Sequence, residues 1–371
     1  MIRRAERSDI NLQLSLSRRV VFLTVVLTFP FLLASCGGLM KVDPLVEAQK
    51  SIAAADPFMG DWQGDWELDD GTQAGPLVAQ VIALGNGKYR AVCFDQFDAR
   101  IEPRAVLNDE VEDAEASFTG KADSEGGPID IKAAIAGDKF TGSFKGWDFS
   151  GTFELTKTVR VSPALGAEPP AGAIVLFNGK NFKQWKHTPP RAKKGQKPKP
   201  APKTVQWNLD KKQKLMEVEP RTGSIVTKKK FTDFKLHVEF RLPFMPDKQG
   251  QARANSGVYL QGRYEVQVLD SYGLEGLDNE CGGIYKVGRP AVNMCAPPMQ
   301  WQTYDITFHA PKAGKPARAT VVHNGVTIHD EIELPGPTGG ALDANVNEPG
   351  GIYLQDHGNR MQFRNIWLVE L

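Results

Sequence analysis

The chain has 371 residues, of which 41% are apolar and 24% charged, a composition that fits a folded protein of two ordinary domains and excludes a largely disordered one. Its 45 lysines and arginines nearly balance its 44 aspartates and glutamates, so no overall charge attracts nucleic acid or anionic lipid. We therefore expect a neutral small molecule as partner, and no nucleic acid.

The first 36 residues are typical of a bacterial export signal. Arginines precede an uncharged apolar run, Val20 to Ala34, that is too short to span a bilayer comfortably. The run ends in Leu-Ala-Ser-Cys-Gly, which resembles the lipobox of bacterial lipoproteins. We predict a signal peptide over residues 1–36, acylation of Cys36, and a periplasm-facing, outer-membrane or cell-surface location with the lipid as the only membrane anchor. The alternative is a secreted protein in which Cys36 is incidental.

A tether is predicted over residues 37–56 and a small antiparallel β domain over residues 57–160. Short β-like runs in this domain alternate with Gly, Asp and Asn, as strands joined by turns do. The stretch from Gly60 to Trp66 resembles the Gly-x-Trp start of small barrels, in which the indole closes one end. The expected strands are 77–84, 89–94, 116–119, 129–135, 139–144 and 151–155.

A linker is predicted over residues 161–172, because this stretch is rich in proline and alanine. A second all-β domain is predicted over residues 173–371. Within it, the lysine- and proline-rich stretch 188–203 is expected to be a solvated loop.

Alternating apolar and polar residues from Lys235 to Leu242 predict a strand with one wet face, and repeated strands of this kind predict two packed sheets. His237, Glu239 and Arg241 share one face of the strand. They could extend a cleft, but a solvated outer face is the favoured interpretation.

The same alternation runs from Val258 to Val268. It places these residues on one face: Tyr259, Gln261, Arg263, Glu265 and Gln267. Side chains two residues apart on a strand lie about 7 Å apart. Asp270 has the opposite parity and joins them only through a bulge or a strand end. Carboxylates and amides bind sugar hydroxyls while an aromatic ring covers the sugar, so the pattern suits a carbohydrate; an ordinary exposed strand face is the alternative.

The remaining cysteines show no zinc-type spacing with histidine. Cys93 is expected to be a buried thiol, whereas Cys281 and Cys295 could form a disulfide or stay free. No cofactor is identified and no metal ligand set is predicted. A divalent cation such as calcium stays open, because loop carboxylates and carbonyls could bind it.

The second domain contains, in order, the blocks Val175–Phe182 with Trp185, Asn255–Leu260, Gly262–Ser271, Gly283–Tyr285, Gly351–Gly358 and Phe363–Ile366. These blocks resemble the 3-keto-disaccharide hydrolase family across residues 173–371. The resemblance implies a concanavalin A-like jelly-roll sandwich, related in shape to the laminarinase-type β-glucanases, and a glycoside or oligosaccharide substrate. Those glucanases carry Glu-x-Asp-x-x-Glu on a bulged strand, whereas this chain has Glu265-Val-Gln267-Val-Leu-Asp270.

This departure speaks against hydrolysis by two glutamates, which requires paired carboxyl groups about 5 Å apart. A 3-keto sugar can instead be cleaved by elimination and hydration. The resulting hypothesis makes Glu265 or Asp270 the base and His357 the acid or base at the leaving oxygen, with Arg263 and Gln267 binding the enolate. Further predicted substrate-binding residues are Tyr259, Asn255, Ser256, Gln355 and Tyr285. The alternative function is a non-catalytic carbohydrate-binding surface lipoprotein.

Overall fold

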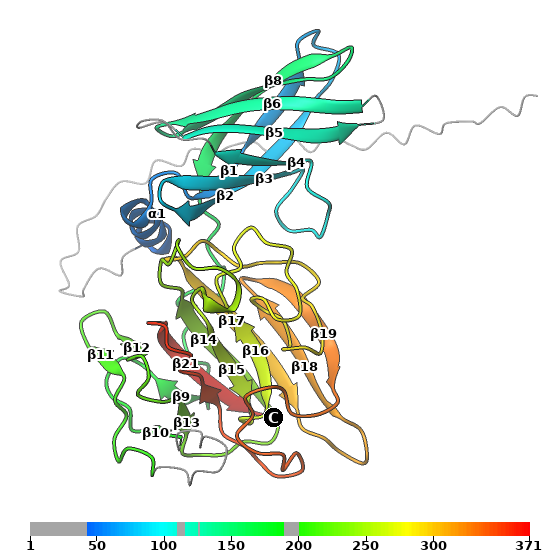
Figure 1. The fold of residues 1–371 in the computed structure, drawn as a ribbon. Coiled ribbons are helices and arrows are strands. Elements are labelled where there is room, and N and C mark those ends of the chain that lie inside the picture. The colour runs from blue at the N-terminus through cyan, green and yellow to red at the C-terminus, as the bar shows by residue number, and fades with distance from the viewer. Residues whose placement is uncertain (1–42, 110–115, 125–126, 189–199) are drawn as a thin grey trace, which may run out of the picture. The chain divides into compact units, whose positions relative to one another are not determined.

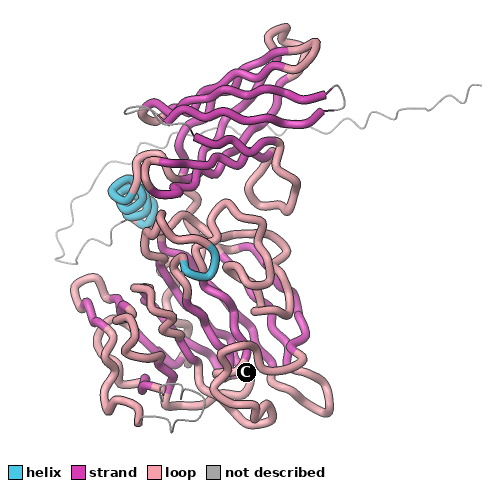
Figure 2. The backbone as a smooth tube through the Cα atoms, viewed as in Figure 1, coloured by secondary structure: helices cyan, strands magenta, loops and turns pink. Residues whose placement is uncertain are grey.

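The computed structural model describes residues 43–109, 116–124, 127–188 and 200–371 (Figure 1). Strands dominate this part of the chain, whose helices are α1 (Pro44–Ala55) and a 3-10 turn, η1 (Gly250–Ala252) (Figure 2). The prediction of an all-β chain is confirmed. None of the described helices is long and apolar enough to cross a membrane. The predicted signal peptide, Cys36 and most of the lysine-rich stretch lie outside the described residues.

Eight antiparallel strands close into a barrel (Figure 1). Each strand pairs with the next in sequence, and β1 also pairs with β8, which completes the ring. All six predicted runs lie within these strands, while β1 and β4 fall outside them. The strands are β1 (Gly60–Leu68), β2 (Ala74–Gly85), β3 (Lys88–Phe94), β4 (Ala105–Asp109), β5 (Ala116–Ser124), β6 (Gly127–Ala136), β7 (Lys139–Lys145) and β8 (Ser150–Thr158).

One end of the barrel is filled by aromatic side chains. Trp62 is fully buried, and its indole N–H donates to the carbonyl of Phe58 at 3.1 Å. The ring of Phe140 packs edge-on against Trp62 and also contacts Phe118. Trp62 is therefore a structural plug rather than a binding platform.

Two further antiparallel sheets follow the barrel in sequence. The five-stranded sheet has the order β10 (Trp185–His187), β13 (Ile225–Thr227), β20 (Tyr353–Leu354), β15 (Ser256–Leu260) and β16 (Tyr264–Val268). The larger sheet has the order β11 (Asn208–Asp210), β12 (Leu215–Glu217), β21 (Gln362–Glu370), β14 (Phe234–Arg241), β17 (Trp301–His309), β18 (Ala317–His323) and β19 (Val326–Leu334), with β9 (Ile174–Phe177) paired to β21.

Buried side chains from both sheets form one apolar core. Val258 and Val266 of the five-stranded sheet belong to the same packed cluster as Phe240, Tyr304 and Phe363 of the larger sheet. Because side chains alternate along a strand, the intervening residues of β15 and β16 point away from this core. Those residues form the face on which the predicted site lies. The concanavalin A-like jelly roll itself stays a prediction.

On the outer face of β14, His237, Glu239 and Arg241 are buried, so the expectation of a solvated face at these residues is wrong. His237 is fully buried: its Nδ1 lies 2.7 Å from Oδ1 of Asp305, and its ring stacks on Trp367. The second ring nitrogen faces Glu239 at 3.6 Å, which is an ion pair rather than a hydrogen bond.

The segment that lies against the outer face of β14 belongs to the predicted linker. Glu239 accepts hydrogen bonds from the backbone N–H of Gly166 and from Nε of Arg364, both at 2.7 Å. The indole of Trp367 donates to the carbonyl of Ala167 at 3.3 Å. Alternation within β14 does not reveal that a distant segment lies against it.

Cys93, Cys281 and Cys295 are free, buried thiols. The expected buried state of Cys93 is confirmed. Sγ of Cys281 lies 3.2 Å from the hydroxyl of Tyr304 within the core.

Candidate active site

Strands β15 and β16 form a hairpin, so the alternating run from Val258 to Val268 folds back on itself. Gln261 and Gly262 have φ angles of 51° and 68°, a left-handed turn that glycine adopts without steric cost. Tyr259 and Glu265 consequently become cross-strand partners. Gly262 is the signal in the sequence for this turn.

Four strands contribute neighbouring side chains to the outer face of the five-stranded sheet. Val226 pairs with Tyr353, Tyr353 with Tyr259, and Tyr259 with Glu265. The first three form a buried cluster of their own, separate from the core. Glu265 thus lies at the end of an apolar and aromatic row.

Gly257 makes room for the carboxylate of Glu265. A Cβ at position 257 would overlap with Oε1 of Glu265 and would lie 2.9 Å from Cε2 of Tyr259. Both contacts are closer than real Cβ atoms make, so only glycine fits here without displacing the carboxylate. The sequence alone assigns Gly257 no role, because the missing side chain carries no chemical signal.

Two glutamines flank this position. Gln267 pairs with Gly257 across the hairpin, and the N–H of Gln355 donates to the Gly257 carbonyl at 3.1 Å from the other side. Nε2 of Gln267 donates to Oε1 of Gln251 at 3.3 Å and to Oδ1 of Asn255 at 3.4 Å.

The side-chain nitrogen of Gln355 donates to the hydroxyl of Tyr259 at 3.1 Å. The carbonyl oxygens Oε1 of Gln267 and Gln355 are both buried, and neither has a hydrogen-bond partner among the described residues. One hydrogen-bond acceptor therefore lies on each side of Gly257, and the carboxylate of Glu265 lies above Gly257.

The face is covered by a segment that we call the cover, Thr338–Asp343. The hydroxyl of Thr338 accepts from the N–H of Glu265 at 2.9 Å, and Tyr259 donates to the carbonyl of Gly339 at 2.8 Å. Glu265 is only 3% exposed. The partly exposed Gln355 marks the edge at which solvent reaches the site.

Asp270 is not brought to this group. Its carboxylate pairs with Nε of Arg253 at 2.5 Å, while Nη1 of Arg253 donates to the carbonyl of Ala83 at 3.2 Å. Burial raises the pKa of Asp270, and Arg253 opposes this rise. Strand β16 ends at Val268, two residues before Asp270, and beyond this strand end the carboxylate of Asp270 is turned to Arg253.

Arg263 also faces a structural partner. Its Nε donates to Oδ1 of Asp343 at 2.6 Å and its Nη1 to the carbonyl of Glu348 at 2.7 Å. These bonds fasten the end of the cover to the hairpin loop. Arg263 is 1% exposed.

The other predicted residues lie around the edge. Asn255 donates through its side chain to the carbonyl of Gln251 at 2.8 Å, and the hydroxyl of Ser256 donates to the carbonyl of Gln355 at 2.8 Å. Tyr285 is partly exposed, and its backbone N–H donates to the carbonyl of Glu265 at 3.2 Å. Asn255 and Tyr285 therefore border the site, whereas Ser256 holds two strands together.

His357 is exposed, in a turn two residues beyond Gln355. The carboxylate of Asp356 holds this turn by accepting from the N–H of Gly358 at 2.8 Å and of Gly223 at 2.9 Å. Gln251 was missed by sequence reasoning, because it reaches the site from η1 and matches no pattern.

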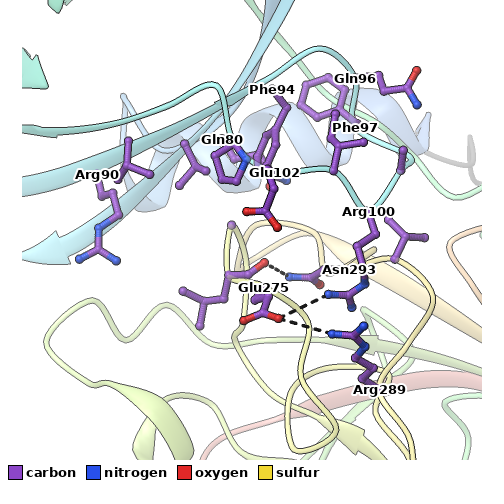
Figure 3. Close-up of a pocket in the computed structure, with 18 residues that line it drawn as sticks. Gln80, Arg90, Phe94, Gln96, Phe97, Arg100, Glu102, Glu275, Arg289 and Asn293 are labelled. Carbon is purple, nitrogen blue, oxygen red and sulfur yellow. Dashed lines mark hydrogen bonds and ion pairs between the residues drawn. The ribbon is translucent and has the colours of Figure 1, made fainter. Parts of the chain in front are cut away.

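A polar cavity of about 550 Å³ is a second candidate (Figure 3). Glu275 lies between Arg100 and Arg289, at 3.8 and 3.7 Å. Arg100 further donates to the carbonyl of Gly276 at 2.7 Å. Because Glu275 already pairs with Arg100 and Arg289, and Glu265 is not among the lining residues, we place the candidate active site on the sheet. Among the described residues no group of three or more His, Cys, Asp or Glu side chains is placed to hold a metal ion.

Comparisons with known proteins give a family and two similar structures. Residues 172–369 match the model of the 3-keto-alpha-glucoside-1,2-lyase-like domain. Two similar structures are described as candidate glycosyl hydrolases from Parabacteroides distasonis ATCC 8503. One is 35% identical, with 54% of this chain and 85% of that chain covered and a TM-score of 0.46. The other is 20% identical, with 54% and 94% covered and a TM-score of 0.39. No curated protein matches the chain.

Proposed function

Because the chain belongs to the 3-keto-alpha-glucoside-1,2-lyase-like domain family through residues 172–369, we propose that it cleaves glycosides that carry a ketone at C3, with Glu265 as the base. Membership confirms the resemblance to 3-keto-disaccharide hydrolases, and it makes the chain a glycosyl hydrolase-like protein. The 3-keto substrate, the elimination route and the concanavalin A-like jelly roll are part of the proposal.

One observation carries the assignment of the site: two buried amide carbonyls that have no partner in the described part of the chain flank the carboxylate of Glu265. An unsatisfied buried acceptor costs roughly 1–3 kcal/mol, so natural proteins seldom retain one without a reason. Sugar hydroxyls are donors that would satisfy both Gln267 and Gln355. The carboxylate between them would then face a ring carbon of the bound sugar.

The chemistry requires one base and a proton for the leaving group. The ketone at C3 acidifies the hydrogen on C2, so Glu265 takes this proton and the electron pair forms the C1=C2 bond. The C1–O bond breaks, and the glycosidic oxygen leaves with a proton. Water then adds its hydroxyl to C1 and its proton to C2, and the overall result is hydrolysis.

Other groups have supporting roles in this proposal. His357 supplies the proton to the leaving oxygen, because it is exposed and follows Gln355 by two residues. Arg263 acts as a positioning residue through Asp343, to which it is bound, rather than by touching the enolate. Since Glu265 is covered, the substrate enters when the cover, Thr338–Asp343, moves away from Tyr259.

We further propose that the protein is exported and anchored through a lipid on Cys36. The support is the arginine-rich start, the short apolar run and the lipobox-like residues 33–37. The boundaries proposed for the domains are 57–160 and 173–371, joined by 161–172. No metal or other cofactor is required by the proposed chemistry.

The decisive experiment measures turnover of a 3-keto-glucoside by the parent and by Glu265→Gln. Loss of a base typically lowers the rate 10²- to 10⁴-fold, so we expect a fall of that order with binding retained. The matched control is Glu333→Gln on strand β19, which is exposed and pairs with Arg318. Turnover of Glu265→Gln within a few-fold of the parent would reject the assignment. A parent that binds the sugar without consuming it would favour a carbohydrate-binding lipoprotein.

A further inference from the structure

The barrel contains a cavity of about 980 Å³ that the proposed sugar chemistry does not use. Its inner wall comes from alternate residues of the strands and is apolar. Side chains that line it include Leu77, Cys93, Leu107, Ile131, Phe144 and Phe153. Its volume is at the upper end of the roughly 300–1,000 Å³ typical of small-molecule sites, and eight-stranded barrels can hold one small ligand.

The cavity stays open because its aromatic rings lie along the wall. Trp66 pairs across the strands with Gly75, and Phe144 pairs with Gly151. A Cβ at Gly75 would lie 3.1 Å from Nε1 of Trp66, and one at Gly151 would overlap with the ring of Phe144.

The ring of Phe153 covers Gly142 in the same way. Each glycine thus lets its partner ring fold flat against the barrel wall instead of crossing the interior. At the opposite end no such arrangement holds, because Trp62 and Phe140 fill the interior. The barrel is therefore closed at one end and hollow at the other.

A single polar atom stands out in this hollow. The indole nitrogen of Trp66 is buried and has no hydrogen-bond partner among the described residues. Buried indole N–H groups usually find an acceptor, so this one lacks the acceptor that a ligand could supply. Phe144 lies edge-on to Trp66 at 6.1 Å, and Phe149 follows at 6.4 Å from Phe144, which provides aromatic surfaces around the same point.

The rim carries charges of both signs, which favours an uncharged ligand. Arg104 and Lys121 line the cavity together with Glu102, Asp123 and Asp148. Arg104 is already paired with Asp95. Lys121 likewise pairs with Asp130, so both cations among these lining residues are engaged and neither is left to select an anionic head group.

We propose that this hollow, bounded by Trp66, Phe144 and Phe153, binds an uncharged, planar aromatic molecule that presents one hydrogen-bond acceptor to the indole of Trp66. The apolar body of the ligand fills the space left open by the rings that lie over the three glycines. This site is independent of the sugar chemistry on the five-stranded sheet.

The test is a fluorescence titration of the full chain with 6-propionyl-2-(dimethylamino)naphthalene, an uncharged aromatic ketone whose emission shifts to the blue in apolar surroundings. We expect saturable binding of one probe per chain. Ala122→Phe adds a ring inside the cavity and should weaken binding at least roughly tenfold. Thr119→Phe on the same strand adds it outside and should leave the affinity within about twofold, since surface changes act weakly.

A second variant tests the hydrogen bond and does not depend on how well Ala122→Phe folds. Trp66→Phe keeps an aromatic ring but removes the donor, so binding of the ketone should weaken about two- to tenfold. Binding of 2-(dimethylamino)naphthalene, which lacks the carbonyl, should change little. The proposal fails if the parent shows no saturable binding, if folded Ala122→Phe binds like the parent, or if Trp66→Phe binds the ketone unchanged.

Discussion

Oε1 of Glu265 occupies the space above Gly257 on the neighbouring strand, where any Cβ would overlap with it. The position of the proposed base is therefore fixed by a residue that has no side chain. Gly257 is the register partner of Gln267 across the hairpin, and on its other side its carbonyl accepts from the backbone N–H of Gln355. The space between Gln267 and Gln355 and the position of the Glu265 carboxylate above it therefore both depend on Gly257.

Gly257→Ala should therefore reduce activity without unfolding the protein. The new methyl group displaces the carboxylate of Glu265, and a displacement of about 1 Å can cost on the order of 10²-fold in rate. Turnover of a 3-keto-glucoside measures the effect. Gly336→Ala is the control, because open space surrounds Gly336 and it should keep parental activity. Parental turnover by Gly257→Ala would show that the carboxylate position is unimportant.

Gln267→Met should weaken substrate binding while keeping or improving stability. The change removes a buried acceptor without a partner and only two long hydrogen bonds, so the free energy of unfolding should stay within about 1 kcal/mol of the parent or rise. KM for the keto-glycoside should rise roughly tenfold, as expected for one lost hydrogen bond to a buried group.

Gln302→Met is the matched contrast for this prediction. Its Oε1 accepts from the N–H of Ala296 at 2.8 Å and contacts Nε2 of His323 at 3.0 Å, so its loss should destabilise the fold by about 1–3 kcal/mol. KM should change little. An unaltered KM for Gln267→Met would remove Gln267 from the substrate site.

Sequence alternation was sufficient to place Glu265 and Gln267 on one face, because strand parity is a local property. It was insufficient for Gln261 and Arg263, since the turn at Gly262 takes both off that face. It also missed Gln251, which approaches from a separate segment and contacts Gln267 only in the folded chain.

The buried face around His237 and the hollow of the barrel could not be predicted from the sequence, for a related reason. Glu239 is buried because Gly166, far away in the chain, lies against it. The hollow depends on the pairing of β1 with β8, whose residues are separated by most of the domain. Strand existence follows from local patterns, whereas these features follow from long-range pairing.

The His237 cluster should make stability depend on pH. Burial disfavours the imidazolium, but the carboxylates of Asp305 and Glu239 that face it raise the pKa of His237 from 6.5 to about 9. A raised pKa means that the folded state binds the proton more tightly. The stabilisation is therefore complete below about pH 6.5 and is lost as the pH rises through about 9.

Urea unfolding near pH 6 and pH 9.5 measures this loss, which should amount to roughly 3 kcal/mol. His237→Phe keeps the stacking on Trp367 and should remove that part of the pH dependence. His309→Phe is the control, because His309 is half-exposed and 3.9 Å from Asp233. A parental slope in His237→Phe would contradict the assignment.

Cys36→Ala should release the protein from membranes. If Cys36 carries the lipid, the variant loses its only anchor, and the protein should move from the membrane fraction to the soluble fraction of the cell envelope. Immunoblotting of separated fractions detects the shift. Cys93→Ala, which changes a buried barrel thiol, should stay with the membrane. A membrane-bound Cys36→Ala protein would show that another element attaches the chain.

Asp270→Asn separates a structural role from a catalytic one. Asp270 and Arg253 are both buried, and neutralising the carboxylate leaves the guanidinium without its anionic partner. Breaking a buried ion pair in this way costs about 3–5 kcal/mol, so the midpoint of urea unfolding should fall clearly.

Turnover by the folded fraction of Asp270→Asn should nevertheless remain within a few-fold of the parent, because Asp270 lies beyond the end of the strand that carries Glu265 and its carboxylate is paired with Arg253. Asp343→Asn is the comparison: it weakens the bond of Arg263 to a half-exposed carboxylate and should cost far less stability. If Asp270→Asn instead kept its stability and lost its turnover, Asp270 would be the base.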